Sequence, residues 1–208
     1  MPSYAMMVFL LPRGTCKDIE TLMNEYWWTG TVGSGKGIWW RSWQGLTALK
    51  AVGGMGFRSL HETNLALLGK QAWRLVTRPN SIVARVYKAR YYPNSTYDQA
   101  VEGSNPSFIW RGLLEVQRVI RDGCRRSIGD GHDTVIGKHA WLPCVDEPFV
   151  TTPVDEETFN SPVSSLFDAQ NTGWDVQRMR SVFNARDASL ILNIPISVQR
   201  PRDSWYWY

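Results

Sequence analysis

The chain has 208 residues, 43% of them hydrophobic and 20% charged, a composition that suits one domain or one domain with a tail. Its net charge of +4 is uneven, because residues 1–144 hold 18 Lys and Arg against 10 Asp and Glu, whereas residues 145–208 hold 5 against 9. Three cysteines exclude a disulfide framework. The apolar stretch at 5–11 is too short for a membrane span or a signal peptide. We therefore expect an intracellular protein, nuclear or cytoplasmic, without a membrane partner.

Four helices are predicted in the first part of the chain. Residues 16–28 place an apolar stripe at helical spacing, which we expect to face the core. A helix over about 59–77 ends before Pro79, and Ser81 caps a third over about 82–91. The fourth, about 106–121, has Asn105 as its N-cap. The residues expected to face inward on the first and third helices are Ile19, Leu22, Met23, Tyr26, Trp27, Ile82, Val83, Val86 and Tyr87.

The pattern changes after residue 123. Residues 125–137, with a Gly-Asp-Gly turn, predict a β-hairpin, and residues 145–162 have the Pro/Ser/Thr-rich composition of an acidic linker. A short helix near 175–184 precedes a truncated aromatic end. We therefore expect a mainly α fold, a helical bundle over 1–123, a hairpin and Trp-Leu-Pro segment over 124–144, and a poorly ordered tail over 145–208.

No motif for catalysis, a cofactor or a metal is complete. Residues 30–37 nearly match a phosphate-binding loop, but Gly37 stands where Mg²⁺ needs a hydroxyl ligand. Cys124, His132, His139 and Cys144 lack the tight spacing of a zinc knuckle, which favours unrelated structural roles. Two-metal polymerase chemistry needs converging aspartates, and the chain has no adjacent Asp-Asp pair. We therefore expect no enzymatic activity, cofactor or metal site.

Basic residues on the second and third predicted helices form the best candidate site. Cations neutralise nucleic-acid phosphates, and the tyrosines at 91 and 92 could stack on bases or, as the alternative, pack helices together. Solvated surface charge is the alternative for the cations. The candidate nucleic-acid-binding residues are Lys70, Arg74, Arg78, Arg85, Lys88 and Arg90.

Residues 53–74, GGMGFRSLHETNLALLGKQAWR, resemble a segment of plant LINE-type (non-LTR) retrotransposon reverse transcriptases, downstream of the polymerase catalytic core. The resemblance continues through Lys88-Ala89-Arg90-Tyr91-Tyr92-Pro93, Ile128-Gly129-Asp130-Gly131 and Trp141-Leu142-Pro143, and covers nearly the whole chain. It departs from the family at His139-Ala140, where Asp-Pro is usual.

The resemblance implies a thumb and connection region, which in such polymerases grips the primer–template backbone. The family's Tyr-x-Asp-Asp motif would lie upstream, and its zinc-binding and RNase H-like segments downstream. We therefore expect a non-catalytic reverse-transcriptase fragment that binds RNA, DNA or an RNA–DNA hybrid without sequence preference. A helical protein-interaction module, or a degenerate reading frame without a cellular function, are the alternatives.

Overall fold

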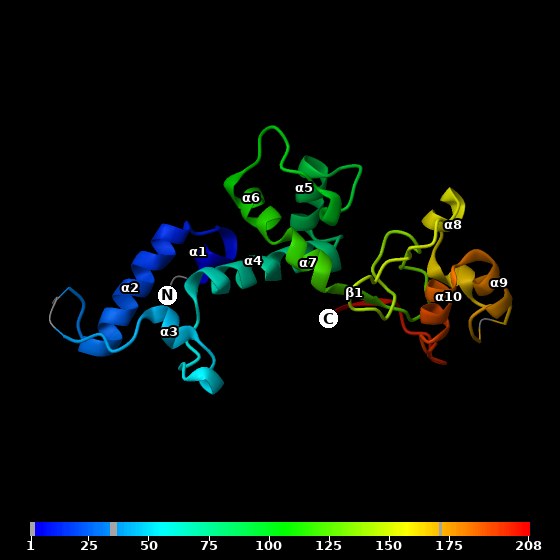
Figure 1. Cartoon of the computed structure of the whole chain (residues 1–208). Helices are drawn as coiled ribbons and strands as arrows, with labels where there is room; N and C mark the ends of the chain where they lie inside the picture. Colours follow the sequence, from blue (N-terminus) through cyan, green and yellow to red (C-terminus); the bar gives the residue numbers. More distant parts are fainter. Residues whose placement is uncertain (1–2, 34–36, 171) are drawn as a thin grey trace. The chain divides into compact units, whose positions relative to one another are not determined.

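The structure is a computed structural model that describes residues 3–33, 37–170 and 172–208. The chain divides into two compact units, Met1–Asp122 and Gly123–Tyr208. The fold is mainly α-helical with a small antiparallel sheet, which confirms the predicted fold class (Figure 1). The elements up to the boundary of the two units are α1 (Ser3–Val8), α2 (Arg13–Thr29), α3 (Trp43–Thr47), η1 (Lys50–Val52), α4 (Leu60–Thr77), α5 (Ile82–Tyr91), η2 (Tyr97–Gln99), α6 (Phe108–Glu115) and α7 (Gln117–Gly123).

Helix α4 is the central element of the first unit. It contacts α1, α2, α5 and α6, and buries one side of its surface. Ser59 caps it by accepting a hydrogen bond from the Glu62 amide. Asn64 is fully buried, and its amide nitrogen donates to the carbonyls of Met6 and Phe9 at 2.6 and 2.9 Å. This side chain therefore fastens the N-terminal segment to α4.

A cluster of aromatic rings fixes α5 against α6. Trp110 is fully buried, and the ring of Tyr91 stacks on it at 4.5 Å with an interplanar angle of 4°. Tyr92 stacks at 5.7 Å, and Tyr97 meets the same indole edge-on. Tyr91 and Tyr92 therefore pack helices together, which was the alternative to base stacking.

The aliphatic side of α5 is oriented differently from the prediction. Ile82, Val83 and Val86 were expected to face inward, yet Ile82 is 78% exposed and both valines are 57% exposed. A helix of ten residues can bury only part of its circumference. Aromatic rings bury more area than aliphatic side chains, so the tyrosine side occupies the interior.

Helix α2 shows a similar difference. Its predicted inward stripe includes Leu22, Tyr26 and Trp27, all of which are about half exposed or more. Asn24 and Glu25 are buried instead. The Asn24 amide donates to the Arg41 carbonyl, and the Gly33 amide donates to the Glu25 carboxylate at 2.9 Å. These bonds to the following loop set the rotation of α2.

The predicted fourth helix is broken in two. Residue Val116 separates α6 from α7, and Ser107 rather than Asn105 caps α6 by accepting a hydrogen bond from the Trp110 amide at 3.2 Å. Ser107 is the cap because the helical conformation begins only at Phe108, so that Ser107, with its extended backbone at φ −71° and ψ 157°, takes the N-cap position.

In the second unit, the sheet does not form the predicted hairpin over 125–137. Strand β1 (Cys124–Ser127) pairs instead with β2 (Ser204–Trp207), with Arg126 opposite Trp205. The further elements of this unit are α8 (Glu156–Asn160), η3 (Val163–Leu166), α9 (Val176–Val182) and α10 (Ala185–Leu192).

Asp203 explains this pairing, because its carboxylate organises the turn after β1. The amides of Gly129 and Gly131 donate to Oδ1 at 2.7 and 2.9 Å. The Asp133 amide and the Thr134 hydroxyl donate to Oδ2. Burial would raise the pKa of Asp203, but the hydrogen bonds outweigh it and hold the pKa below its usual range.

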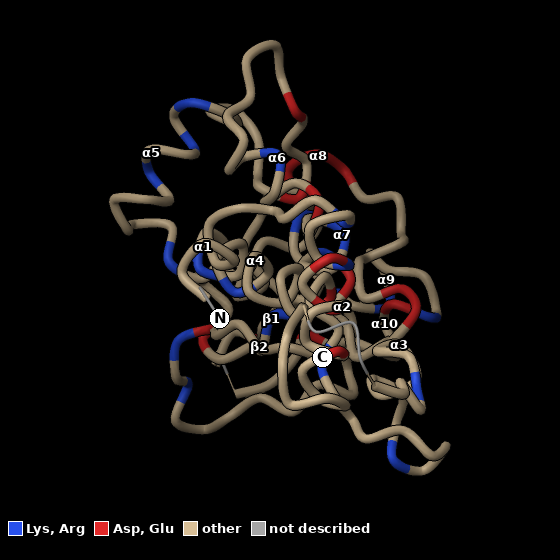
Figure 2. The backbone as a smooth tube through the Cα atoms, turned by 90° about the vertical axis from the view of Figure 1, so that its left-hand side faces the viewer, with Lys and Arg blue, Asp and Glu red and all other residues tan. Residues whose placement is uncertain are grey.

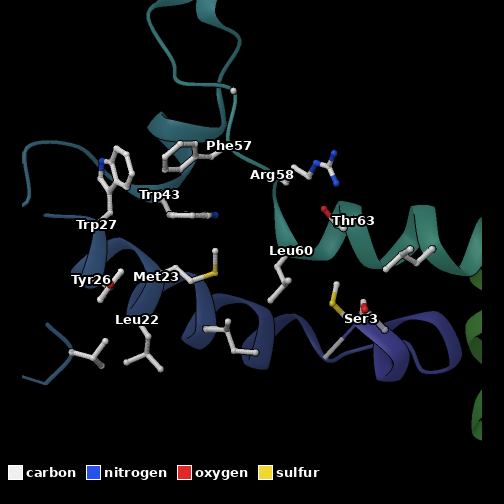
Figure 3. A pocket seen from close by; sticks show the side chains of 15 residues that line it. Ser3, Leu22, Met23, Tyr26, Trp27, Trp43, Phe57, Arg58, Leu60 and Thr63 are labelled. Carbon is white, nitrogen blue, oxygen red and sulfur yellow. The ribbon is translucent and has the colours of Figure 1, made fainter. Parts of the chain in front are cut away.

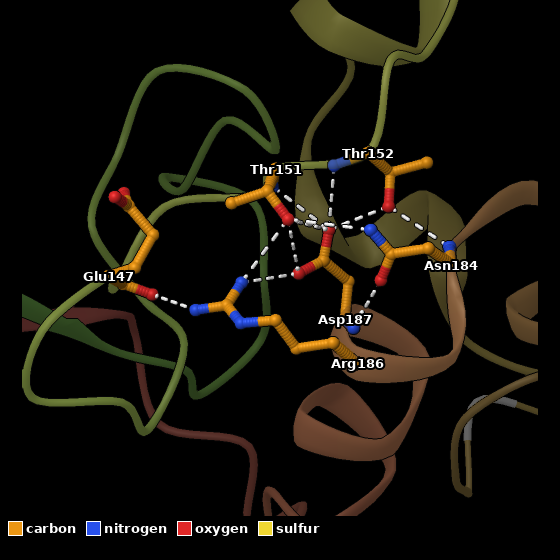
Figure 4. A network of polar contacts seen from close by, with 6 residues as sticks. All are labelled: Glu147, Thr151, Thr152, Asn184, Arg186 and Asp187. Atoms are coloured by element: carbon orange, nitrogen blue, oxygen red, sulfur yellow. Dashed lines mark hydrogen bonds and ion pairs between the residues drawn. The ribbon is translucent and has the colours of Figure 1, made fainter.

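Residues 145–208 were predicted to be a linker and a poorly ordered tail, but they build much of a core. Helices α9 and α10 pack together, and a buried carboxylate, Asp187, holds the loop before α8 (Figure 4). The amides of Thr151 and Thr152 donate to its Oδ2 at 2.9 and 2.8 Å. The core cluster consists of Ile136, Trp141, Leu142, Val163, Leu166, Met179, Phe183, Ala188 and Ile191. The division into 1–123, 124–144 and 145–208 stays a prediction.

Candidate nucleic-acid interface

Lys70 and Arg74 lie on the C-terminal half of α4, and Arg78 directly follows the helix. The buried positions of α4 occupy the opposite part of the helix, so Lys70 and Arg74 are exposed. Arg78 is exposed too, but it is the C-terminal cap and has left the helical conformation at φ −129° and ψ 61°. Its amide still donates to the Arg74 carbonyl at 2.9 Å. The row of basic residues on α4 therefore continues to Arg78, whose own backbone is no longer helical.

The cations of α5 divide into two groups. Arg85 and Lys88 are three residues apart, so they share one side of the helix. Arg90 is about 140° around the helix from Arg85. Its guanidinium lies over the Tyr91 ring at 5.2 Å, a cation–π contact that limits its freedom. The structure therefore brings Arg85 and Lys88 together and separates Arg90 from them.

All six candidate side chains are exposed, and among the described residues none of them is within ion-pair distance of a carboxylate. Arg74 has one polar side-chain contact, to the Gln71 side-chain oxygen at 3.2 Å. Helix α5 carries Lys and Arg without an intervening Asp or Glu (Figure 2). Since α4 and α5 contact each other, these cations are carried by two helices that pack together.

The four residues considered for zinc do not gather into a site. Cys124 is buried in β1, and the Nδ1 atom of His139 accepts a hydrogen bond from the Val135 amide at 2.9 Å. His132 lies 3.3 Å from the Ser164 hydroxyl through its own Nδ1. Among residues 3–33, 37–170 and 172–208, no group of three or more His, Cys, Asp or Glu side chains could hold a metal ion.

The phosphate-loop near-match at 30–37 falls partly outside the described residues, at positions 34–36. Gly30 ends α2 in the left-handed conformation, and its amide donates to the Tyr26 carbonyl. A helix, rather than the strand that the motif requires, therefore precedes the loop. Across the described parts of the chain, we find no helix whose length and apolar content would let it cross a membrane.

An apolar groove beside α2 was missed by the sequence reasoning. It is lined by residues of α1, α2, α3 and α4 and of the loops between them, and its volume is about 850 Å³ (Figure 3). The helical spacing of Leu22, Tyr26 and Trp27 is the signal that could have found it. That spacing indicates an apolar face, but it cannot distinguish a face buried in the core from one that is left open.

Comparison with known proteins places the chain among plant relatives. It is 36% identical over 143 residues to the uncharacterized mitochondrial protein AtMg00310 of Arabidopsis thaliana, and the match covers 68% of this chain and 92% of that protein. The chain belongs to the same family as AtMg00310. No family model matches it, and no solved structure does.

A second relative of this AtMg00310-family chain is much longer. The putative ribonuclease H protein At1g65750 of Arabidopsis thaliana is 24% identical over 185 residues, which cover 86% of this chain. The chain spans 29% of the length of that protein. The two relatives together support the plant retroelement-related origin that the sequence motifs predict.

Proposed function

We propose that this chain is a non-catalytic segment related to the thumb and connection region of a LINE-type, non-LTR reverse transcriptase. We further propose that it binds nucleic-acid backbones without sequence preference. The observation that carries the binding proposal is the set of six exposed cations on α4 and α5, none of which is within ion-pair distance of a described carboxylate. Neutralised cations would have lost most of their attraction for phosphate, whereas these retain it.

The mechanism is electrostatic. Each phosphate that a Lys or Arg neutralises releases condensed counterions, which makes binding favourable and dependent on salt. Lys70 and Arg74 present two charges about one helical turn apart, and Arg85 and Lys88 present two more. Four to six phosphate contacts correspond to a slope of about −4 to −5 in a plot of log K against log salt concentration on a duplex.

The tyrosines make no contribution to base recognition in this proposal, because their rings are committed to Trp110. Base-edge contacts would give sequence preference, whereas backbone contacts would not. We therefore expect RNA, DNA and RNA–DNA hybrids of unrelated sequence to bind with similar affinity at equal salt.

The test is a binding titration of the full chain with an RNA–DNA hybrid over a range of salt. The Lys70→Gln/Arg74→Gln double variant should reduce the magnitude of the slope by about 2, because two phosphate contacts are lost. Lys138→Gln, a single change of the same type in the second unit, is the control for a general loss of charge. An unchanged slope in the double variant would reject α4 as the interface.

A further inference from the structure

The groove beside α2 exposes an unusual amount of apolar surface. Leu22, Tyr26, Trp27 and Val32 line it and are between 47% and 61% exposed. Exposed apolar side chains scattered singly are normal on a protein surface, but contiguous patches of this kind mark interaction sites. The first three belong to one broad apolar face of α2, with Leu22 and Trp27 at its two edges about 140° apart.

Aromatic packing gives the opposite wall of this groove a defined shape. Phe57 meets Trp27 edge-on at 4.9 Å and Trp43 at 5.3 Å. Leu60, at the start of α4, is nearly fully buried and closes the floor. The groove is therefore a formed surface bordered by two helices and an aromatic cluster, and does not depend on a single loose side chain.

Two polar groups indicate what the occupant must carry. The Trp43 Nε1 atom is buried without a hydrogen-bond partner, and in Figure 3 the nitrogen edge of that ring points towards the space beside Leu60. Arg58, on the rim, is exposed and has no carboxylate within ion-pair distance among the described residues. An occupant with a hydrogen-bond acceptor and a negative charge would satisfy both groups.

The charge at the groove favours the same chemistry. Arg58 is the one charged side chain among the described residues that line it, so a negatively charged group on the occupant suits this rim better than a positive one. The half-exposed side chains along α2 form an open strip, which suits a helix lying across it better than an enclosed small molecule.

We propose that this groove binds an amphipathic polypeptide helix with an apolar face and acidic flanking residues. Its apolar side chains would cover Leu22, Tyr26 and Trp27, and an acidic side chain would pair with Arg58. The long Arabidopsis relative shows that a region similar to this chain occurs within a polypeptide more than three times as long as the match, so additional polypeptide accompanies the region there. This proposal is independent of nucleic-acid binding.

The test uses the full chain and a labelled synthetic helix of about 18 residues, with leucines at i, i+3, i+4 and i+7 and glutamates flanking them. We expect saturable binding by fluorescence anisotropy, and at least tenfold weaker binding of the same peptide with lysines in place of the glutamates. Leu22→Glu should reduce affinity at least tenfold. Ile82→Glu, the same type of change on the exposed side of α5, should leave affinity unchanged.

Three further measurements complete the test. Circular dichroism should show that Leu22→Glu remains folded, which its exposure predicts, and Arg58→Gln should reduce the preference for the glutamate peptide. The proposal is overturned if neither peptide binds saturably, or if Leu22→Glu and Ile82→Glu bind equally well. It is also overturned if sedimentation shows a dimer that Leu22→Glu dissociates, because a second copy would then occupy the groove.

Discussion

Asp203→Asn should destabilise the second unit strongly, because one carboxylate serves four hydrogen-bond donors. An asparagine oxygen at the Oδ1 position could keep the bonds from Gly129 and Gly131. Its amide group would then face the Asp133 amide and the Thr134 hydroxyl, which donate to Oδ2 at 3.2 and 2.7 Å. The Thr134 hydroxyl can rotate, but the Asp133 amide would lose its acceptor and meet another donor.

The magnitude follows from these contacts. Hydrogen bonds to a charged group contribute about 1.5–3 kcal/mol each. The variant loses the bond from the Asp133 amide and loses or reverses the bond from the Thr134 hydroxyl. The variant also removes the charge opposite Arg126, whose Nη2 lies 3.8 Å from Oδ2 with both side chains buried. We expect the free energy of unfolding to fall by about 3–5 kcal/mol, a large part of the stability of a typical domain.

Urea denaturation of the full chain, followed by tryptophan fluorescence, measures this effect. With a slope of about 2 kcal/mol per molar urea, a loss of 3 kcal/mol lowers the midpoint by roughly 1.5 M. Asp146→Asn, an exposed change in the same unit, should alter stability by less than about 0.5 kcal/mol. Equal midpoints for the two variants would refute the role assigned to Asp203.

Three other stability predictions follow from the packing and the buried carboxylates. Trp110→Ala should cost about 3–5 kcal/mol in thermal or urea unfolding, whereas Ile82→Gln should change stability by less than about 0.5 kcal/mol; equal losses would contradict the orientation of α5. Gly129→Ala should destabilise the chain in the same urea assay, because its Cβ would lie 1.9 Å from the Pro201 carbonyl oxygen, and an unchanged midpoint would count against this close approach. The pKa values of Asp187 and Asp203 are lowered in the folded state. Their contribution to the free energy of unfolding should therefore be fully present above the unfolded pKa of about 3.9, and should be lost as pH falls through the folded pKa values. Urea midpoints that rise on acidification from about pH 5 to 3 would contradict this.

The sequence predicted where most helices lie but not which sides they bury. Caps such as Ser81 and breakers such as Pro79 act locally, so their positions mark helix ends directly. The orientation of α5 depends on the fit of Tyr91 to Trp110, and that of α2 depends on hydrogen bonds of Asn24 and Glu25 to a later loop. Both are tertiary effects that helical periodicity alone does not contain.

The pairing of β1 with β2 could not be predicted from local sequence patterns either. The Gly-Asp-Gly turn after β1 has the composition of a hairpin turn, but its amides are held by Asp203, far along the chain. Among the site residues, the exposure of Lys70 and Arg85 could be expected from their charge. The separation of Arg90 from Lys88 follows from the geometry of the predicted helix over 82–91, whereas the contact of Arg90 with the ring of Tyr91 comes from the structure alone.

The salt dependence of binding to an RNA–DNA hybrid tests the proposed function most directly. Anisotropy titrations of the full chain at several concentrations between about 50 and 200 mM salt should give a linear log–log plot with a slope of about −4 to −5. The Lys70→Gln/Arg74→Gln variant should give a slope smaller in magnitude by about 2. Binding that is absent at the lowest salt, or unchanged across the range, would contradict a phosphate-binding role for α4 and α5.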